Sequence, residues 1–260
     1  TWMSGLTYSM NKNKIESLAD NVINPITGQL FSIPSLDMGG YADLRFILRE
    51  GGSMGDLYSR TDLRRDANGA IYMDESNNVY TQKIDNPDSY IKLGSVLPKG
   101  NLAWRNNFMW KNFHVGFMIS ARLGGVVFSR TQAILDKFGV SEASADARDN
   151  GFVLINGNDR INPENWYTTV GSTAVPQYYT YSATNVRLQE ASIGYTIPRK
   201  WLANVCDIKV SLIGRNLWMI YNKAPFDPES VASTDNFYQG IDYFMMPSLR
   251  NIGFNLSFKF

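Results

Sequence analysis

The chain closes with a segment, residues 249–260, in which apolar and polar residues alternate. This period of two is typical of a β-strand with one apolar face and one polar face. Such a strand fits a membrane barrel, where lipid contacts the apolar face and a water-filled lumen accepts the polar face. It also fits an ordinary amphipathic strand, so the segment alone leaves both alternatives open. The residues that we expect to face lipid are Ile252, Phe254, Leu256, Phe258 and Phe260.

The same alternation predicts further strands earlier in the chain. Within one of them the apolar positions change parity, which predicts a β-bulge near Gln189 and Glu190. Lys111 and Asn112 form the turn of the clearest hairpin. Together with the closing segment, the predicted strands number roughly seven. Those before the closing segment are residues 2–10, 41–50, 102–110, 113–123, 186–197 and 208–220.

The connections between these strands alternate in length. Residues 111–113 and 198–205 are short, whereas 51–100, 124–184 and 221–247 are long. Tight turns on one side and long loops on the other are typical of outer-membrane barrels. The segment 14–40 is an exception, because it is a long connection on the side where short turns are expected.

Composition excludes several other classes of protein. The 25 basic and 24 acidic residues balance, so we expect no nucleic-acid partner. No run of about 18 apolar residues is present, so the sequence contains no candidate spanning helix. A single cysteine, Cys206, and a single histidine, His114, exclude an internal disulfide and a metal site built on several such residues. The first residues lack the pattern of a signal peptide and lie within a predicted strand, so we expect the chain to begin inside a larger protein.

Six short segments, taken in order, resemble the SusC/RagA family of TonB-linked outer-membrane transporters of Bacteroidetes. Each is weakly specific, but together they follow the family's order over nearly the whole chain. The closing strand, which ends in phenylalanine, also resembles the carboxy-terminal signal by which outer-membrane barrels are recognised for assembly. The six segments are residues 8–18, 92–99, 186–198, 214–217, 226–229 and 246–250.

The resemblance implies an all-β fold, a transmembrane antiparallel β-barrel with long extracellular loops in the bacterial outer membrane. Members resemble plugged barrels of about 22 strands, of which residues 1–260 would be the C-terminal segment. The implied function is TonB-dependent import of glycan fragments or peptides. The implied partners are a SusD-like lipoprotein that acts as a lid, the remaining N-terminal part of the barrel, the lipid bilayer, and TonB acting through a region absent here. The signal peptide, TonB box and plug of the family have no counterpart in this sequence.

Aromatic residues in the long loops are the candidate ligand-binding residues. Their rings could stack on sugars or contact a peptide. Aromatic girdles and loop cores use the same residue types, so the pattern leaves a structural role open. The candidates are Trp166, Tyr167, Tyr178, Tyr179, Tyr181, Phe237, Tyr238 and Tyr243.

The sequence offers little for an enzyme or a metal site. The run from Asp66 to Ile71, with Asp74 beyond it, resembles half of a calcium loop but departs from its spacing and lacks the final glutamate, so a polar turn is favoured. Asp146, Asp149 and Asp159 lie in a loop rich in aspartate and form no catalytic motif. We therefore expect no enzyme, no metal and no cofactor. The alternative function is a soluble or secreted all-β carbohydrate-binding module, which would bury its apolar faces against each other in water.

Overall fold

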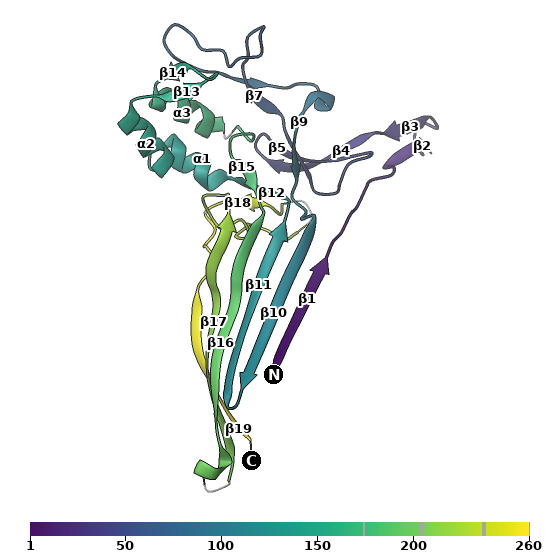
Figure 1. Ribbon diagram of the computed structural model, residues 1–260. Helices are drawn as coiled ribbons and strands as arrows, with labels where there is room; N and C mark the ends of the chain where they lie inside the picture. The colour runs from purple at the N-terminus through teal and green to yellow at the C-terminus, as the bar shows by residue number, and fades with distance from the viewer. Residues whose placement is uncertain (174, 203–204, 236–237, 260) are drawn as a thin grey trace.

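A computed structural model describes residues 1–173, 175–202, 205–235 and 238–259. It consists of a six-stranded sheet and a group of smaller elements at one end of that sheet (Figure 1). Both chain termini lie at the opposite end. Within the described ranges, no helix is long and apolar enough to cross a membrane.

The six-stranded sheet is antiparallel throughout, and its strands follow chain order. The sheet stays open, with its first and last strands at the edges. The expected antiparallel sheet is therefore present, with six strands where the sequence predicted roughly seven. The strands are β1 (Trp2–Ser9), β10 (Gly100–Trp110), β11 (Phe113–Leu123), β16 (Asn185–Ile197), β17 (Asp207–Asn222) and β19 (Asn251–Lys259).

The strand predicted at residues 41–50 lies outside this sheet, so its assignment to the barrel wall was wrong. It is β5 (Leu44–Arg49), part of a separate four-stranded sheet with β4 (Ser35–Tyr41), β6 (Asp56–Ser59) and β9 (Ile91–Ser95). A strand that packs one face on a core has the same period of two as a strand that faces lipid, so alternation cannot separate them.

This correction removes the exception at residues 14–40. The chain leaves the sheet after β1 and returns only at β10, so residues 10–99 form one excursion. All three long excursions, 10–99, 124–184 and 223–250, leave the same end of the sheet. The short connections lie at the other end, and the expected one-sided arrangement is confirmed.

The excursions contain the remaining elements. The first holds the hairpin β2 (Ala19–Ile23) and β3 (Leu30–Ile33), the pair β7 (Thr61–Leu63) and β8 (Thr81–Lys83), and η1 (Pro87–Ser89). The second holds β12 (Val126–Ser129), α1 (Arg130–Lys137), α2 (Glu142–Asn150), β13 (Val153–Ile155), β14 (Asp159–Ile161), α3 (Pro163–Thr173) and β15 (Thr180–Ser182). The third holds β18 (Ile241–Asp242), and η2 (Arg199–Trp201) lies in a short connection at the other end.

The three excursions share one hydrophobic core. Phe46 of the first, Phe128 of the second and Ile241 of the third are all buried in it. The shortest strand, β18, pairs with β12 and thereby joins the second and third excursions. We call the described residues of these three excursions, apart from the hairpin at residues 19–33, the loop cap. It is a packed unit rather than a set of independent loops.

Local sequence explains two further features. Helix α1 begins after Ser129, whose Oγ accepts a hydrogen bond from the Gln132 N–H at 3.0 Å and so caps the first turn. The predicted bulge is confirmed. Leu188 pairs with Ile119 and Glu190 with Met118, which leaves Gln189 as the extra residue.

Candidate functional site

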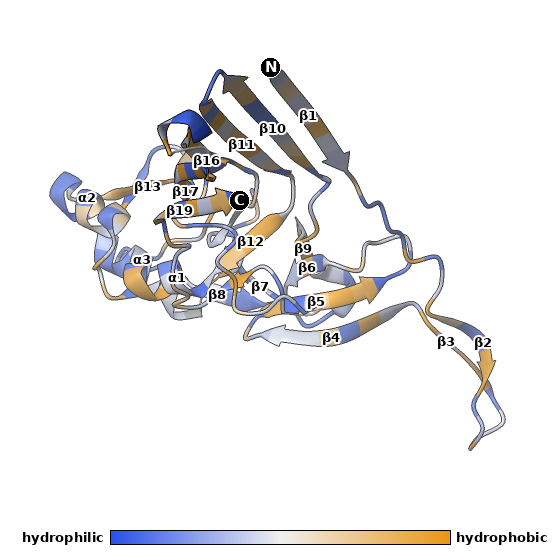
Figure 2. Cartoon of the chain, turned by 90° about the horizontal axis from the view of Figure 1, so that it is seen from below, coloured by the Kyte–Doolittle hydropathy of each residue, from blue (hydrophilic) through white to orange (hydrophobic). Residues whose placement is uncertain are grey.

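The two faces of the six-stranded sheet differ in chemistry. Figure 2 shows hydrophobic and hydrophilic residues alternating in bands along its strands. One row of paired positions crosses all six strands and is apolar throughout, with every side chain exposed. We call this side the apolar face; its row is Trp2, Phe108, Val115, Ile193, Leu212 and Phe254.

The opposite side of the sheet, the polar face, carries charged and amide side chains. Glu190 and Arg215 form an ion pair across β16 and β17, with 3.4 Å between carboxylate oxygen and guanidinium nitrogen. His114 lies 3.0 Å from the Thr196 hydroxyl, which gives this lone histidine a structural partner. A soluble sandwich would cover the apolar face and expose the polar one. Here the side chains of the apolar row are exposed, which is the arrangement that lipid contact requires.

The closing strand follows the same division. Ile252, Phe254, Leu256 and Phe258 are all exposed and lie on the apolar face, whereas Phe260 falls outside the described residues. Asn106 also lies in this face, as an amide that is only 1% exposed. Its side-chain oxygen accepts a hydrogen bond from the Trp2 indole at 3.1 Å, so an aromatic ring shields the amide from the surroundings.

A recess of about 290 Å³ opens on the polar face next to the loop cap. Arg122 borders it; its guanidinium donates to the Val96 carbonyl oxygen at 2.8 Å, and its buried Nε has no hydrogen-bond partner among the described residues. The bulge places Gln189 at the recess, where its amide oxygen accepts a bond from the Ser120 hydroxyl at 3.3 Å. Glu229 of the third excursion completes the lining. The recess thus combines one cation, one anion and several neutral hydrogen-bonding groups.

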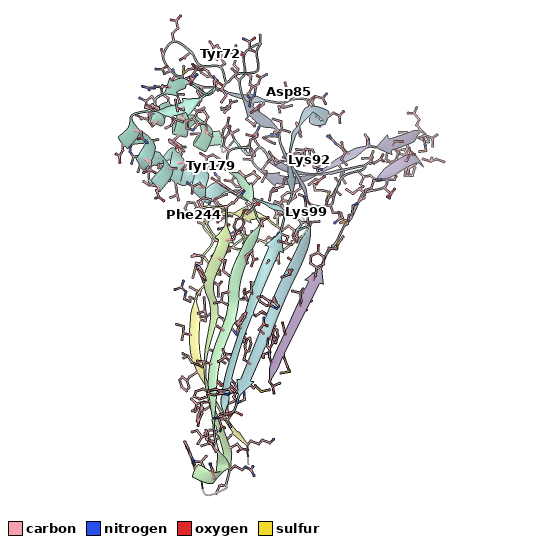
Figure 3. The ribbon with its side chains drawn as sticks, viewed as in Figure 1. Tyr72, Asp85, Lys92, Lys99, Tyr179 and Phe244 are labelled. Atoms are coloured by element: carbon pink, nitrogen blue, oxygen red, sulfur yellow. The ribbon has the colours of Figure 1, made fainter. Side chains whose placement is uncertain are left out.

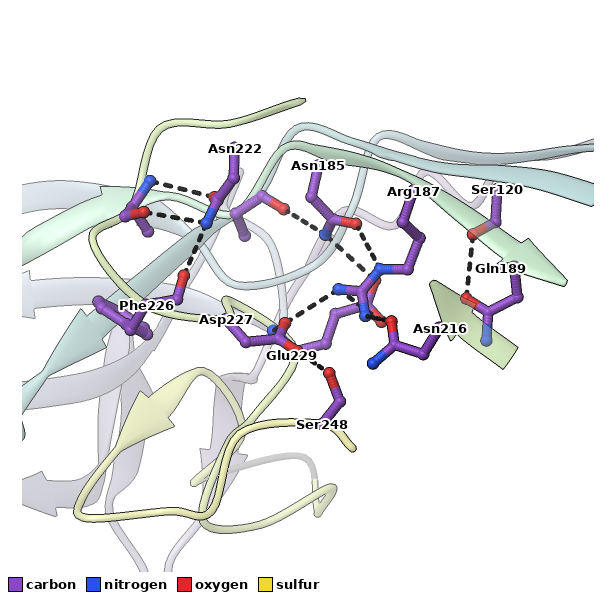
Figure 4. Close-up of polar contacts among 12 residues, drawn as sticks. Ser120, Asn185, Arg187, Gln189, Asn216, Asn222, Phe226, Asp227, Glu229 and Ser248 are labelled. Carbon is purple, nitrogen blue, oxygen red and sulfur yellow. Dashed lines mark hydrogen bonds and ion pairs between the residues drawn. The ribbon is translucent and has the colours of Figure 1, made fainter. Parts of the chain in front are cut away.

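Beside this recess, Arg187 organises a buried polar cluster (Figure 4). Its guanidinium contacts Asp227 at 2.9 Å and Glu229 at 3.3 Å, and it also donates to Asn185 at 3.2 Å and Asn216 at 3.3 Å. The side chains of Arg187 and Asp227 are 4% and 9% exposed, so this pair is shielded from water. We call Asn185, Arg187, Asn216, Asp227, Glu229 and Ser248 the rim cluster.

The rim cluster fastens both ends of the third excursion to the sheet. Asp227 lies near its start, and Ser248, near its end, donates a hydrogen bond to the same carboxylate. Burial alone would raise the pKa of the Asp227 carboxyl, but the hydrogen bonds from Ser248 and Arg187 outweigh it, so the pKa lies below its ordinary value. The carboxylate is therefore charged at neutral pH, and Arg187 keeps its counter-ion.

Sequence reasoning did not identify the rim cluster. Its residues lie in different strands and loops, and Arg187 is 40 positions from Asp227. A signal was nevertheless present, because Arg187, Asn216, Asp227, Glu229 and Ser248 all fall in segments that carry the SusC/RagA resemblance. Four of the six resembling segments thus meet at one place in the fold.

Most of the candidate aromatic residues lie inside the loop cap. Trp166 is 8% exposed and meets Tyr178 edge to face, with 5.4 Å between ring centroids. Tyr179 is 2% exposed and lies within the cap in Figure 3. Burial raises the pKa of Tyr179, and it raises the pKa of Tyr181 to about 12, so both phenols stay neutral. These residues, together with the partly buried Tyr167, build the cap.

Two other candidates remain open to solvent. Tyr238 and Tyr243 are 45% and 46% exposed. Tyr243 packs beside Tyr41, with 5.7 Å between ring centroids, and Tyr238 lies 6.2 Å from Phe46. Each ring therefore has one side held by the cap and another side free. Phe237 lies outside the described residues.

The aspartates of the half calcium loop form turns. Asp66 accepts hydrogen bonds from the Asn68 and Ala70 N–H groups at 2.8 and 3.0 Å. Asp74 repeats the pattern with Ser76 and Asn78 at 2.9 and 2.8 Å. Among the described residues, no group of three or more histidine, cysteine or acidic side chains is placed to hold a metal ion.

Comparison with known proteins gives one sequence relative and several structures. No family model matches the chain. The chain is 25% identical over 289 aligned residues to TonB-dependent receptor P3 of Formosa agariphila, an alignment that covers 100% of this chain and 27% of that receptor. It is similar in fold to a chain of the RagAB peptide importer in the closed-closed state (TM-score 0.62, 16% identity, 100% of this chain and 27% of that chain). The open-open state gives a TM-score of 0.57, with 14% identity over 100% of this chain and 26% of that chain. The chain thus spans about a quarter of the length of these relatives.

Proposed function

We propose that this chain, a homologue of TonB-dependent receptors with the fold of part of RagA, is the carboxy-terminal wall and loop cap of an outer-membrane importer. TonB-dependent receptors are outer-membrane transporters rather than enzymes. The observation that carries the proposal is the apolar row across all six strands, exposed on one face and backed by a polar face. In a membrane barrel, lipid would contact the apolar face, and the water-filled lumen would contact the polar face.

In this proposal the lumen holds the cargo, and the loop cap stands on the extracellular side. The recess at Arg122 and Glu229 offers charged and amide groups to a ligand inside the barrel. The exposed rings of Tyr238 and Tyr243 offer stacking surfaces at the cap. The buried residues among the candidate aromatics, such as Trp166 and Tyr179, act indirectly, because they form the core that holds Tyr238 and Tyr243 in place. Phe237 stays a prediction.

The cargo and partner are inferred from the similar structures. Those structures are of a peptide importer, which favours peptides as the cargo; glycan fragments are the second class. The recess suits either one, because both classes present hydroxyl, amide or carboxylate groups. We further propose that a SusD-like lipoprotein covers the cap as a lid, and that TonB acts through a plug carried by the amino-terminal part of the full-length receptor.

Uptake by intact cells tests this proposal. Cells that produce the full-length receptor are expected to accumulate labelled oligopeptides, and a protonophore is expected to abolish accumulation, because TonB-dependent import draws on the proton gradient. Arg122→Ala is expected to weaken uptake, with Arg105→Ala, on the same face of the sheet but outside the recess, as the matched control. Recovery of the native protein as a free, water-soluble species would overturn the proposal in favour of the carbohydrate-binding module.

A further inference from the structure

The first excursion contains a hairpin that stands apart from the rest of the molecule. It consists of β2, β3 and the turn between them, residues 19–33, and we call it the arm. In both Figure 1 and Figure 2 it extends sideways beyond β1, away from the other strands of the sheet. An isolated two-stranded hairpin is at best marginally stable in water. The arm therefore raises the question of what it packs against.

Both faces of the arm are apolar. Val22 pairs with Phe31, and the neighbouring pair, Ile23 with Leu30, points to the opposite side because successive residues alternate. Val22 and Phe31 are 43% and 39% exposed, and Ile23 and Leu30 are 65% and 64% exposed. Ile26 in the turn is 92% exposed. A strand pair with apolar residues on both faces is typical of one that is enclosed on both sides.

The arm has a locally determined shape. The Asn24 side chain accepts hydrogen bonds from the Ile26 and Thr27 N–H groups at 2.9 and 3.2 Å, and Gly28 closes the turn with a φ of 70°. The chain before the arm is fastened to the cap, because Ile15 exchanges backbone hydrogen bonds with Gly51 and Gly52 at 2.8 and 2.9 Å. The arm thus presents its apolar residues at a defined place relative to the cap.

We propose that the arm inserts between extracellular loops of the rest of the same receptor, on the β1 side, and fastens this part of the barrel to its neighbour. The inference rests on the proposed function. The edge of β1 is open, and an open edge cannot face lipid, so a further strand must continue the wall there. The matched relatives are about four times longer than this chain, so they contain the strands and loops that could do so.

The chemistry of the arm favours extracellular loops of the same receptor, rather than a moving lid, as its partner. Permanent interfaces are the more hydrophobic class, and contacts that form and break repeatedly are more polar. The arm offers five apolar side chains, and its one acidic residue, Asp20, is already bonded to the Ser32 hydroxyl at 2.8 Å. Such a surface suits a contact that is made once during assembly and then kept.

Photo-crosslinking in the full-length receptor tests the arm. Benzoylphenylalanine replaces Ile26 in cells that produce the receptor, and Val140, an exposed apolar residue at the distant α1–α2 turn, serves as the control position. The expected product at Ile26 is a crosslink within one polypeptide, mapped by mass spectrometry to a segment outside residues 1–260. The Val140 position is expected to give no such product. A crosslink to a lipoprotein or to a second copy would overturn the proposal, as would the absence of any crosslink.

A second measurement uses substitutions. The double variant Ile26→Asp with Leu30→Asp is expected to raise the rate of amide hydrogen exchange in residues 19–33 about tenfold, because loss of the enclosure frees the arm. Thr27→Asp, in the same turn, is expected to leave the rate unchanged. Fractionation and heat-modifiable mobility of the unmodified receptor are recorded in parallel. If the receptor forms an outer-membrane barrel but gives no crosslink, only the proposal for the arm is wrong. If the receptor is absent from the outer membrane, the proposed function is wrong as well.

Discussion

The sheet and the loop cap use the same alternation for opposite purposes. In β19, Phe254 and Leu256 point away from the polar face and are exposed. In β5, Leu44 and Phe46 occupy equivalent alternating positions but are 0% and 1% exposed. A soluble core and a lipid bilayer both select apolar residues at every second position. Alternation therefore indicates only that one face of the strand is shielded from water. Whether a protein core or lipid shields it depends on the elements that surround the strand.

The largest expected effect comes from a substitution in the core of the loop cap. Phe46→Ala leaves a cavity in a core built by all three excursions, and such truncations reduce stability by about 3 to 5 kcal/mol. Hydrogen exchange on the full-length receptor is expected to show faster exchange in β5, β6 and β12, with the six-stranded sheet unchanged. Equal acceleration in both regions would contradict the division into sheet and cap.

The next effect concerns the junction between the two regions. Arg187→Met leaves the Asp227 carboxylate buried without a cation, which is expected to destabilise the third excursion by about 3 kcal/mol, at the low end for broken buried ion pairs because Glu229 is 41% exposed. Hydrogen exchange at residues 223–250 measures the effect. The triple variant that also carries Asp227→Leu and Glu229→Gln is expected to recover part of the loss. Failure of that rescue would show that Arg187 acts through packing rather than charge.

The sheet side is tested at the closing strand. Leu256→Arg places a charge on the apolar face and is expected to destabilise the membrane-inserted barrel by about 2 to 4 kcal/mol near the bilayer midplane. Asn255→Arg puts the same side chain on the polar face of the same strand and is the matched control. Folding of the full-length receptor into liposomes under a urea gradient measures both. If Asn255→Arg blocked folding and Leu256→Arg did not, the two faces would be reversed.

The smallest effect is a pH dependence confined to the cap. Hydrogen bonds from the Asn78 N–H and the Tyr80 hydroxyl lower the pKa of Asp74 to about 2, from an ordinary value of 3.8. A lowered pKa stabilises the turn above pH 3.8, and that contribution is lost as the pH falls through about 2. Exchange of the Asn78 amide proton is therefore expected to accelerate over this range. Asp74→Asn is expected to remove the dependence, and its persistence in that variant would assign it to another group.

Local patterns predicted the features that depend on neighbouring residues. The parity change at Gln189, the turn at Lys111 and Asn112, and the faces of β19 all follow from side chains a few positions apart. The assignment of residues 41–50 failed because it depends on what packs over Phe46, and that includes Tyr238, almost two hundred positions away. The rim cluster and the burial of Trp166 and Tyr179 depend on similarly remote contacts, so composition and spacing could not specify them.

The pairing of β12 with β18 has a consequence for the order in which the molecule assembles. Phe128 and Ser129 pair with Ile241 and Asp242, and the Ser129 hydroxyl donates to the Asp242 carboxylate at 2.6 Å across 113 positions. Loop closure over such distances is slow relative to formation of local hairpins. We expect the hairpins of the wall to form first and the cap to close last, after the segment that carries Ile241 has arrived. Pulse-labelled hydrogen exchange during refolding is expected to show that the Phe128 amide becomes protected later than the Phe117 amide. Pairing of the short strand β18 with β12 would then be the last and rate-limiting step of folding.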